Sequence, residues 1–222
     1  MKIIGHRGAR GLAPENTLTG FEKAIEHHVH GIELDVRISK DHRAVLAHNP
    51  KIHNQARDTL AVRHSTLAEL RAHKADVTTL EEAIASINRR VPIIIEVKPK
   101  QPVGPIVTIV QDFMAKGWQP DDLQFISFDY SILKALRKAF PDHIIMVDEL
   151  WSGVRAIWRA RRIGSKDISM FTPFIWTGFV RAISKRGYRL YAFPMNDPKK
   201  AKRWAHAGFY GVITDYPERF ES

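Results

Sequence analysis

The feature that most constrains this chain is a regular alternation between short apolar, β-branched runs and longer amphipathic segments. Continuous apolar runs such as residues 93–95 are typical of strands that are buried on both faces, as in a parallel sheet. Strands that alternate with helices of ten or more residues indicate βαβ units. The strands predicted in this way cover residues 2–5, 31–36, 92–97, 123–127, 143–147, 167–171, 189–193 and 210–214.

Amphipathic segments fill most of the intervals between these strands. Eight parallel strands in a chain of 222 residues predict closure into a barrel. We therefore expect an α/β protein, a (β/α)8 TIM barrel, in which residues 1–222 form one domain. The predicted helices cover roughly residues 17–28, 80–88, 103–116, 130–139, 150–163, 176–186 and 198–207.

One segment interrupts the alternation. A second apolar run, residues 44–47, follows the strand at 31–36 after too few residues for a crossover helix. This spacing predicts a β-hairpin at the rim of the barrel. Residues 50–79 have weak periodicity, and we expect one short helix near residues 66–73. The whole insertion spans about residues 38–79.

Composition excludes several classes of protein. Cysteine is absent, which excludes disulfides, thiolate metal sites and a cysteine nucleophile. The net charge of +10 favours an anionic partner: a phosphorylated small molecule, an acidic membrane surface or nucleic acid. No nucleic-acid-binding motif is present, which argues against the last. The first residues do not have the pattern of a signal peptide, and no apolar run approaches the roughly 18 to 20 residues that span a bilayer. We therefore expect a cytoplasmic protein without an obligate protein partner.

Carboxylates gather near the ends of the second and third barrel strands. Glu33 and Asp35 are two residues apart on a strand, so both side chains face the barrel interior. Glu96 lies at the equivalent height on the next barrel strand. Because neighbouring buried carboxylates repel one another, the set predicts one hard divalent cation, Mg²⁺ or Ca²⁺. The alternative is that Lys98 or Arg37 neutralises the carboxylates.

Two of the eleven histidines also fall at strand ends. His6 and His48 are expected to point at the same rim, whereas most of the others, His143 included, are expected on solvated surfaces. Cleavage of a phosphodiester needs a base for the nucleophile and an acid for the leaving alkoxide, and histidine suits both roles near neutral pH. Arg7 and Lys98 can share the charge that develops on the phosphoryl oxygens.

Seven motifs, taken in order, resemble the glycerophosphodiester phosphodiesterase family over residues 3 to about 217. The resemblance implies a (β/α)8 barrel and divalent-metal-dependent hydrolysis of glycerophosphodiesters to glycerol 3-phosphate and an alcohol. The motifs are His6-Arg7-Gly8, Glu15-Asn16-Thr17, Glu33-Leu34-Asp35, His48-Asn49-Pro50, Glu96-Val97-Lys98, Ser127-Phe128-Asp129 and Ile213-Thr214-Asp215-Tyr216-Pro217.

The resemblance also implies roles for individual residues. His6 and His48 resemble the catalytic acid and base of the family. Glu33, Asp35 and Glu96 resemble its metal ligands. Residues expected by the same resemblance to contact the metal site, phosphate or substrate are Arg7, Glu15, Lys98 and Asn196. In the mechanism expected from this set, the glycerol hydroxyl attacks phosphorus while one histidine takes its proton. The other histidine protonates the departing alcohol, and water then opens the cyclic phosphate.

Two departures from the family pattern bear on this assignment. The family usually has His-Asp where this chain has His48-Asn49. Asn49 can accept a hydrogen bond but carries no charge, so it raises the pKa of His48 less than an aspartate would. The segment Phe193-Pro194-Met195-Asn196 replaces one that usually reads Trp-Thr-Val-Asn, which bears on substrate identity more than on activity.

Two alternatives remain open. Residues 150–163 combine two tryptophans with four arginines, which suits a lysophospholipase D-type lipid phosphodiesterase in contact with an anionic membrane. The same pattern also suits an outer barrel helix whose apolar stripe packs on the strands. The second alternative is a catalytically weak barrel that binds phosphorylated ligands. The net positive charge and Asn49, which replaces the usual aspartate, support it.

Overall fold

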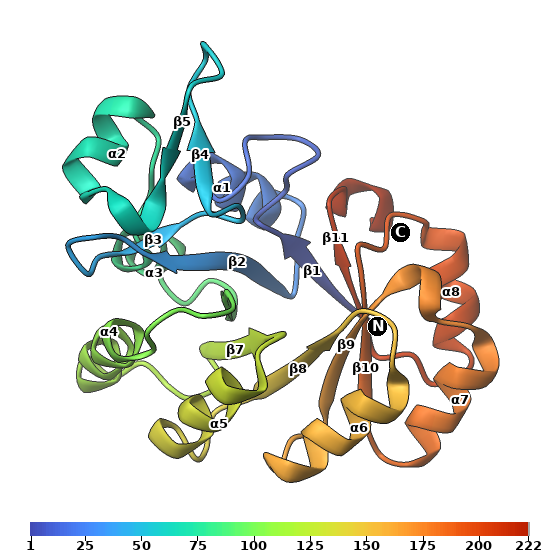
Figure 1. Cartoon of the computed structure of the whole chain (residues 1–222). Helices are drawn as coiled ribbons and strands as arrows, with labels where there is room; N and C mark the ends of the chain where they lie inside the picture. The colour runs from blue at the N-terminus through green and yellow to red at the C-terminus, as the bar shows by residue number, and fades with distance from the viewer. Residues whose placement is uncertain (222) are drawn as a thin grey trace.

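The structure, a computed structural model, describes residues 1–221 and contains a closed ring of eight parallel strands (Figure 1). Strand β1 pairs with β2 on one side and with β11 on the other, which closes the ring. The predicted (β/α)8 barrel is therefore confirmed. The ring strands are β1 (Lys2–His6), β2 (Gly31–Ile38), β6 (Ile93–Val97), β7 (Leu123–Ser127), β8 (Ile145–Glu149), β9 (Asp167–Phe171), β10 (Arg189–Phe193) and β11 (Gly211–Thr214).

Helices surround the ring and connect its strands (Figure 1). They are α1 (Leu18–Glu26), α3 (Leu80–Ile87), α4 (Gly104–Ala115), α5 (Tyr130–Ala139), α6 (Gly153–Arg162), α7 (Thr177–Lys185) and α8 (Pro198–Ala205). Short 3-10 turns follow β9 (Thr172–Phe174) and β11 (Pro217–Phe220). Several helices begin where a side-chain oxygen accepts a backbone N–H of the first turn, which would otherwise lack a partner. These capping residues include Thr17, Thr79, Asp129, Ser152 and Asp197.

The alternation of side chains along the strands places the core and the polar residues on opposite faces of the ring. On β2, Ile32 and Leu34 face the helices within the main apolar core, so Glu33 and Asp35 face the interior. The lower part of the interior is filled by a separate apolar cluster. Its members are Ile4, Ile94, Ile126, Met146, Tyr191 and Ile213. Above this cluster, at the carboxyl ends of the strands, the inward positions of β1, β2 and β6 carry His6, Glu33, Asp35 and Glu96.

The insertion between β2 and α3 has more structure than its sequence suggests. β3 (Ala44–Leu46) pairs antiparallel with β2, which confirms the predicted hairpin. A second hairpin, β4 (Lys51–His53) with β5 (Thr59–Ala61), was not predicted, because three-residue, largely polar strands give no periodic signal (Figure 1). The predicted short helix is α2 (Leu67–His73), which follows a 3-10 turn at Val62–His64.

Strand β8 differs from its predicted position. It begins and ends two residues later than residues 143–147, so Asp148 and Glu149 belong to the strand. His143 was expected on a solvated surface, and this expectation was wrong because the residue is buried. Its ring lies 4.7 Å from that of Phe140 and 5.7 Å from that of Phe125. The imidazole thus packs as an aromatic side chain at the start of the strand. Within residues 1–221, no helix has both the length and the apolar character to cross a membrane.

Candidate active site

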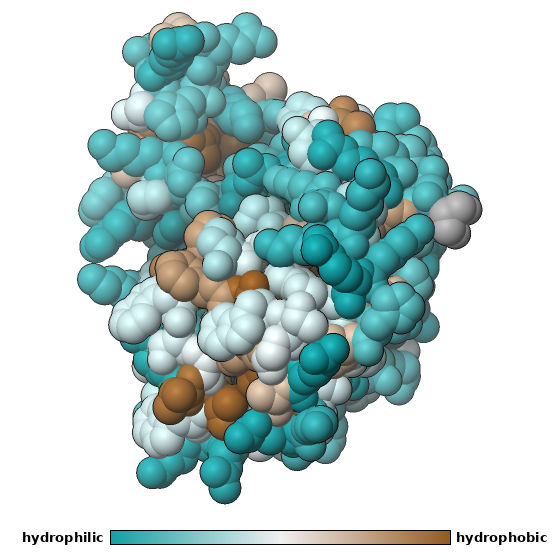
Figure 2. Space-filling view, turned by 90° about the vertical axis from the view of Figure 1, so that its right-hand side faces the viewer, coloured by the Kyte–Doolittle hydropathy of each residue, from teal (hydrophilic) through white to brown (hydrophobic). Residues whose placement is uncertain are grey.

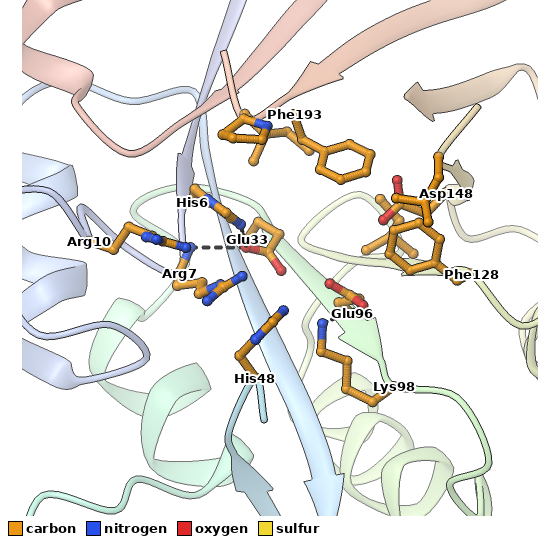
Figure 3. A pocket seen from close by; sticks show the side chains of 14 residues that line it. His6, Arg7, Arg10, Glu33, His48, Glu96, Lys98, Phe128, Asp148 and Phe193 are labelled. Atoms are coloured by element: carbon orange, nitrogen blue, oxygen red, sulfur yellow. Dashed lines mark hydrogen bonds and ion pairs between the residues drawn. The ribbon is translucent and has the colours of Figure 1, made fainter. Parts of the chain in front are cut away.

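A cavity of about 340 Å³ opens at the carboxyl ends of the barrel strands and has two chemically different walls (Figure 3). The charged and imidazole side chains of one wall are His6, Arg7, Arg10, Glu33, His48, Glu96 and Lys98. The apolar residues of the other wall are Ile126, Phe128, Leu150, Phe193, Pro194 and Ile213, among which Asp148 also lies. Active sites of this fold occupy this end of the barrel.

The turn after β1 fixes the first part of the site. The backbone of Arg7 is left-handed (φ 52°), and its N–H donates to Oε2 of Glu33 at 2.9 Å. Gly8 is also left-handed (φ 86°), and a Cβ there would lie 2.6 Å from the backbone of helix α1. This close approach lets the guanidinium of Arg7 reach two carboxylates. Its Nε lies 3.1 Å from Asp35, and its Nη1 donates to Glu15 at 2.8 Å.

The structure brings together the three carboxylates that the sequence predicts as metal ligands. Glu33, Asp35 and Glu96 each offer an oxygen that lies within 4.8 Å of those of the other two. Asp35 and Glu96 are register partners on the neighbouring strands β2 and β6. All three are buried, so their charges are shielded little by solvent.

Burial and mutual repulsion divide the protonation states of this cluster. Burial, together with Asp35 and Glu96, raises the pKa of Glu33 well above its ordinary value. Burial and the neighbouring Asp35 raise the pKa of Glu96 to about 7. Burial opposes ionisation of Asp35 too, but Lys98 and Arg7 more than offset it and hold the pKa of Asp35 well below its usual range. The cluster by itself therefore supports one firmly ionised carboxylate.

Lys98 neutralises part of this cluster. Its Nζ lies 2.6 Å from Asp35 and 2.7 Å from Glu96. Arg37 does not take part, because it donates to the backbone carbonyl of His48 instead. Oε1 of Glu33 is buried and has no hydrogen-bond partner within residues 1–221.

The cluster fits a hard divalent cation. Three oxygen donors converge, one of them is unpartnered, and burial together with the neighbouring carboxylates raises the pKa of two of them. Such oxygen donor sets are those that Mg²⁺ and Ca²⁺ prefer.

His6 is held by a carboxylate at the end of β11. Its Nδ1–H donates to Asp215 at 2.6 Å, while its Nε2 lies 4.0 Å from Glu33. Asp215 in turn accepts from Nδ2 of Asn196 at 2.9 Å and lies 3.3 Å from Nε of Arg10. Burial lowers the pKa of His6, and the hydrogen bond to Asp215 acts in the opposite direction. The arrangement fixes the ring and leaves Nε2 facing the cavity.

His48 reaches the cavity from the insertion. The antiparallel pairing of β2 with β3 brings the chain back over the site, and Nη2 of Arg37 donates to the carbonyl of His48 at 2.7 Å. Asn49 accepts from Nδ1 of His48 at 3.0 Å. Burial and the nearby charge of Lys98 lower the pKa of His48. The rings of His48 and His6 approach Glu33 from two directions (Figure 3).

Comparison with known proteins decides the family. The model of the glycerophosphoryl diester phosphodiesterase family matches residues 6–219. This chain belongs to that family. The family expected from the motifs is therefore confirmed, and the protein is an enzyme of the phosphoric diester hydrolase class.

Three relatives of this phosphodiesterase match along nearly their whole length. A glycerophosphodiester phosphodiesterase of Caldanaerobacter subterraneus is 26% identical over 230 residues, which cover 97% of this chain and 94% of that protein. The crystal structure of a Thermotoga maritima glycerophosphodiester phosphodiesterase is 26% identical, with a TM-score of 0.78 and 98% and 96% of the two chains covered. An Oleispira antarctica phosphodiesterase in complex with sn-glycerol-3-phosphate is 24% identical, with a TM-score of 0.85 and coverage of 99% and 95%.

Two residues expected to bind substrate lie behind the cavity wall in this phosphodiesterase. Asn196 does not line the cavity; its Oδ1 accepts the backbone N–H of Asp215, and its Nδ2 donates to that carboxylate. Glu15 contacts Arg7 and Arg10 and is also outside the cavity lining. Both contact other residues of the site, and their roles toward substrate stay predictions.

Three further residues of the site received no role from the sequence. Asn16 donates to Asp35 at 2.8 Å and accepts the backbone N–H of the same residue, so it orients that carboxylate. Asp215 supports His6. Both residues stand in the quoted motifs, but only their tertiary contacts reveal the partner. Asp148 was missed because β8 was ended at Val147, although it lies two residues after the inward Met146. Burial and nearby Glu96 raise its pKa well above the ordinary value.

Proposed function

We propose that this enzyme hydrolyses glycerophosphodiesters to glycerol 3-phosphate and an alcohol, with His6 and His48 as acid and base and one divalent cation as cofactor. The observation that carries the proposal is the convergence of both imidazoles on a buried three-carboxylate cluster in one cavity. The related Oleispira antarctica phosphodiesterase was crystallised with sn-glycerol-3-phosphate as its product, which supports the same product here.

The cation would be held by Glu33, Asp35 and Glu96, whose oxygens suit Mg²⁺ or Ca²⁺. A bound divalent cation stabilises negative charge on phosphoryl oxygens. Arg7 and Lys98 line the same cavity and supply fixed positive charge toward those oxygens. Burial and mutual repulsion raise the pKa of Glu33 and of Glu96, and the positive charge of a bound cation would offset both effects, so that all three carboxylates could ionise together.

The two histidines differ in a way that suggests separate roles. Burial lowers the pKa of both histidines, but only His6 donates Nδ1–H to a carboxylate, that of Asp215, which acts to retain its protonated form and suits a general acid. His48 has the uncharged Asn49 as its partner, and burial together with nearby Lys98 lowers its pKa, which suits a general base. His48 then takes the proton of the glycerol hydroxyl that attacks phosphorus, and His6 protonates the departing alcohol. In the second step, neutral His6 takes a proton from the water that opens the cyclic phosphate, and protonated His48 returns its proton to the glycerol oxygen.

The first test measures glycerol 3-phosphate released from glycerophosphocholine by purified protein in EDTA, in Mg²⁺ and in Ca²⁺. We expect no release in EDTA and restored release with one or both cations. Absence of release under every condition, from protein shown by circular dichroism to be folded, would refute the proposal and favour a phosphate-binding barrel.

Variants separate the two imidazole roles. We expect His6→Ala and His48→Ala each to abolish turnover of glycerophosphocholine while cation binding, measured by calorimetry, is retained. The p-nitrophenyl ester of glycerol 3-phosphate has a leaving group that needs little protonation, so His6→Ala, unlike His48→Ala, should still release p-nitrophenol from it. Rescue of His48→Ala instead would reverse the roles, and loss of cation binding in either variant would show that the histidine is a ligand.

A lipid glycerophosphodiester is a second candidate substrate, as in a lysophospholipase D-type reaction. The observation that favours it is the apolar wall of the cavity, which continues through Leu150 to the surface. Comparing turnover of lysophosphatidylcholine with that of glycerophosphocholine tests it directly. A higher kcat/KM for the lysolipid would support the lipid substrate.

A further inference from the structure

Exposed apolar side chains are concentrated beside the cavity. Within residues 1–221, nine large hydrophobic side chains are exposed, and the six outside Met1, Leu12 and Leu18 lie on two neighbouring segments that follow β8 and β9. Figure 2 shows the molecule from the side of α7 and α8, where a pale-to-brown area is bordered by hydrophilic residues. We call these six residues the apolar rim. They are Leu150, Trp151, Val154, Trp158, Phe174 and Trp176.

Helix α6 has two apolar faces, and only one of them packs on the barrel. Its buried face is made of the small residues Ala156 and Ala160. Trp151, Val154 and Trp158 are three and four residues apart and therefore share another face of the segment. They are 60%, 82% and 48% exposed. The sequence pattern left open whether the tryptophans pack on the strands, and the structure leaves both largely in solvent.

The apolar rim is continuous with the wall of the cavity. Leu150 lines the cavity and is itself 45% exposed. Along the same wall, at the ends of the adjacent strands β9 and β10, the rings of Phe193 and Phe171 lie 5.9 Å apart, and that of exposed Phe174 lies 6.2 Å from Phe171. A surface that covered the rim would therefore meet the opening through which substrate enters.

Contacts beneath the rim hold it in place. Oε1 of Glu149 accepts the backbone N–H groups of Leu150 and Trp151 and pairs with Arg155 at 2.6 Å. The ring of Trp176 lies 5.3 Å from that of Phe179, which in turn packs against the start of α6. The tryptophans are thus exposed from an ordered backbone, and their exposure is a property of the fold.

Helix α6, which carries part of the rim, is also basic. It contains four arginines and no acidic residue. Arg155 pairs with Glu149 and Arg159 lies 3.7 Å from the same carboxylate, whereas Arg161 and Arg162 form no ion pair within residues 1–221. The guanidinium groups of Arg155 and Arg162 lie over the rings of Trp151 and Trp158. Tryptophan beside arginine is the pairing favoured at the headgroup level of a bilayer, where the ring meets apolar chains and the cation meets phosphate.

We propose that the apolar rim docks this enzyme on an anionic lipid bilayer, with the mouth of the cavity at the level of the headgroups. Charge complementarity favours a bilayer of anionic lipids over a second copy of this chain, because two such surfaces in a dimer would bring like charges together. The proposal concerns binding and does not depend on which glycerophosphodiester is hydrolysed.

The test is co-sedimentation with vesicles of phosphatidylcholine alone and of phosphatidylcholine mixed with phosphatidylglycerol. We expect the unaltered enzyme to bind the anionic vesicles only, and less at high salt. The variant Trp151→Ser/Val154→Ser/Trp176→Ser changes residues that do not line the cavity. Its affinity for the anionic vesicles should be lower by a factor of about ten or more. The control Lys185→Ser/Arg186→Ser removes two exposed charges at the end of α7 opposite the cavity, and should retain binding.

Turnover of glycerophosphocholine and circular dichroism check that both variants are folded. No binding of the unaltered enzyme to anionic vesicles at low salt would overturn the proposal. Equal loss of binding in the control would also overturn it, since attraction would then come from overall charge. Self-association of the unaltered enzyme that disappears in the rim variant, without vesicle binding, would assign the rim to a second copy and overturn it as well.

Discussion

Replacing Asp215 by asparagine tests whether His6 acts as a supported general acid. The Asp215 carboxylate accepts the Nδ1–H of His6 at 2.6 Å in a largely buried setting. Asparagine has nearly the same shape but no charge, and its amide can donate to Nδ1 and so place the proton on Nε2 when the ring is neutral. The substitution therefore removes the stabilisation of the imidazolium while leaving the packing in place.

The expected loss follows from the strength of this hydrogen bond. A hydrogen bond to a charged group contributes about 1.5 to 3 kcal/mol. If that stabilisation acts in the transition state, kcat for glycerophosphocholine should fall about 10- to 160-fold. Because Asp215 acts to raise the pKa of His6, its loss lowers that pKa further. A general acid must be protonated, so the basic limb of the pH–rate profile should move to lower pH.

The assay is the initial rate of release of the alcohol across a pH series, choline from glycerophosphocholine and p-nitrophenol from the p-nitrophenyl ester. The ester should lose far less rate than glycerophosphocholine, because its leaving group needs little protonation. Asp197→Asn is the matched control, since Asp197 caps helix α8 and asparagine caps equally well. An unchanged basic limb, or equal losses for both substrates, would refute the role given to His6.

Three further predictions concern stability and the cation site. With cations chelated, the stability conferred by protonated Glu96 is present below pH 4.5 and is lost as pH rises to about 7. Glu96→Gln should therefore raise the free energy of unfolding at pH 8 by about 3 kcal/mol and weaken Mg²⁺ binding in calorimetry. A lower free energy of unfolding in this variant would contradict the prediction. Phe125→Ala removes a fully buried ring that stacks on Phe140. Urea unfolding should show that the free energy of unfolding falls by about 3 to 5 kcal/mol, whereas a fall of less than about 1 kcal/mol would mean that neighbouring side chains fill the cavity. Thr79→Ala removes the cap of α3 and should cost about 1 kcal/mol in the same assay, with no loss expected for Thr79→Ser.

The sequence predicted much of the fold because the strands of a closed parallel barrel are buried on both faces. Such strands read as continuous apolar runs, and β7 and β9 begin and end where the runs do. The failures occurred where that signal is mixed. β8 continues through the acidic Asp148 and Glu149, and a pattern of apolar residues ends the strand too early. The hairpin of β4 and β5 is short and polar, so only its pairing defines it.

Residue spacing likewise determined which chemical groups share a face. Glu33 and Asp35 are two apart on one strand, and parallel pairing then places Glu96 beside them, so the carboxylate cluster follows from local geometry and barrel closure. His6 lies on the same inner face for the same reason.

Contacts between segments far apart in the chain were decided only by the tertiary structure. Asp215 supports His6 from 209 residues away, and Asn16 supports Asp35. In both pairs a loop residue contacts a strand residue, and no local sequence pattern encodes the direction that the loop takes. The exposure of Trp151 and Trp158 was undetermined for a related reason. A periodic pattern predicts that apolar residues share a face of a helix. Which of two such faces packs on the barrel depends on the side chains that fit there. On α6, the small Ala156 and Ala160 allow the closer packing.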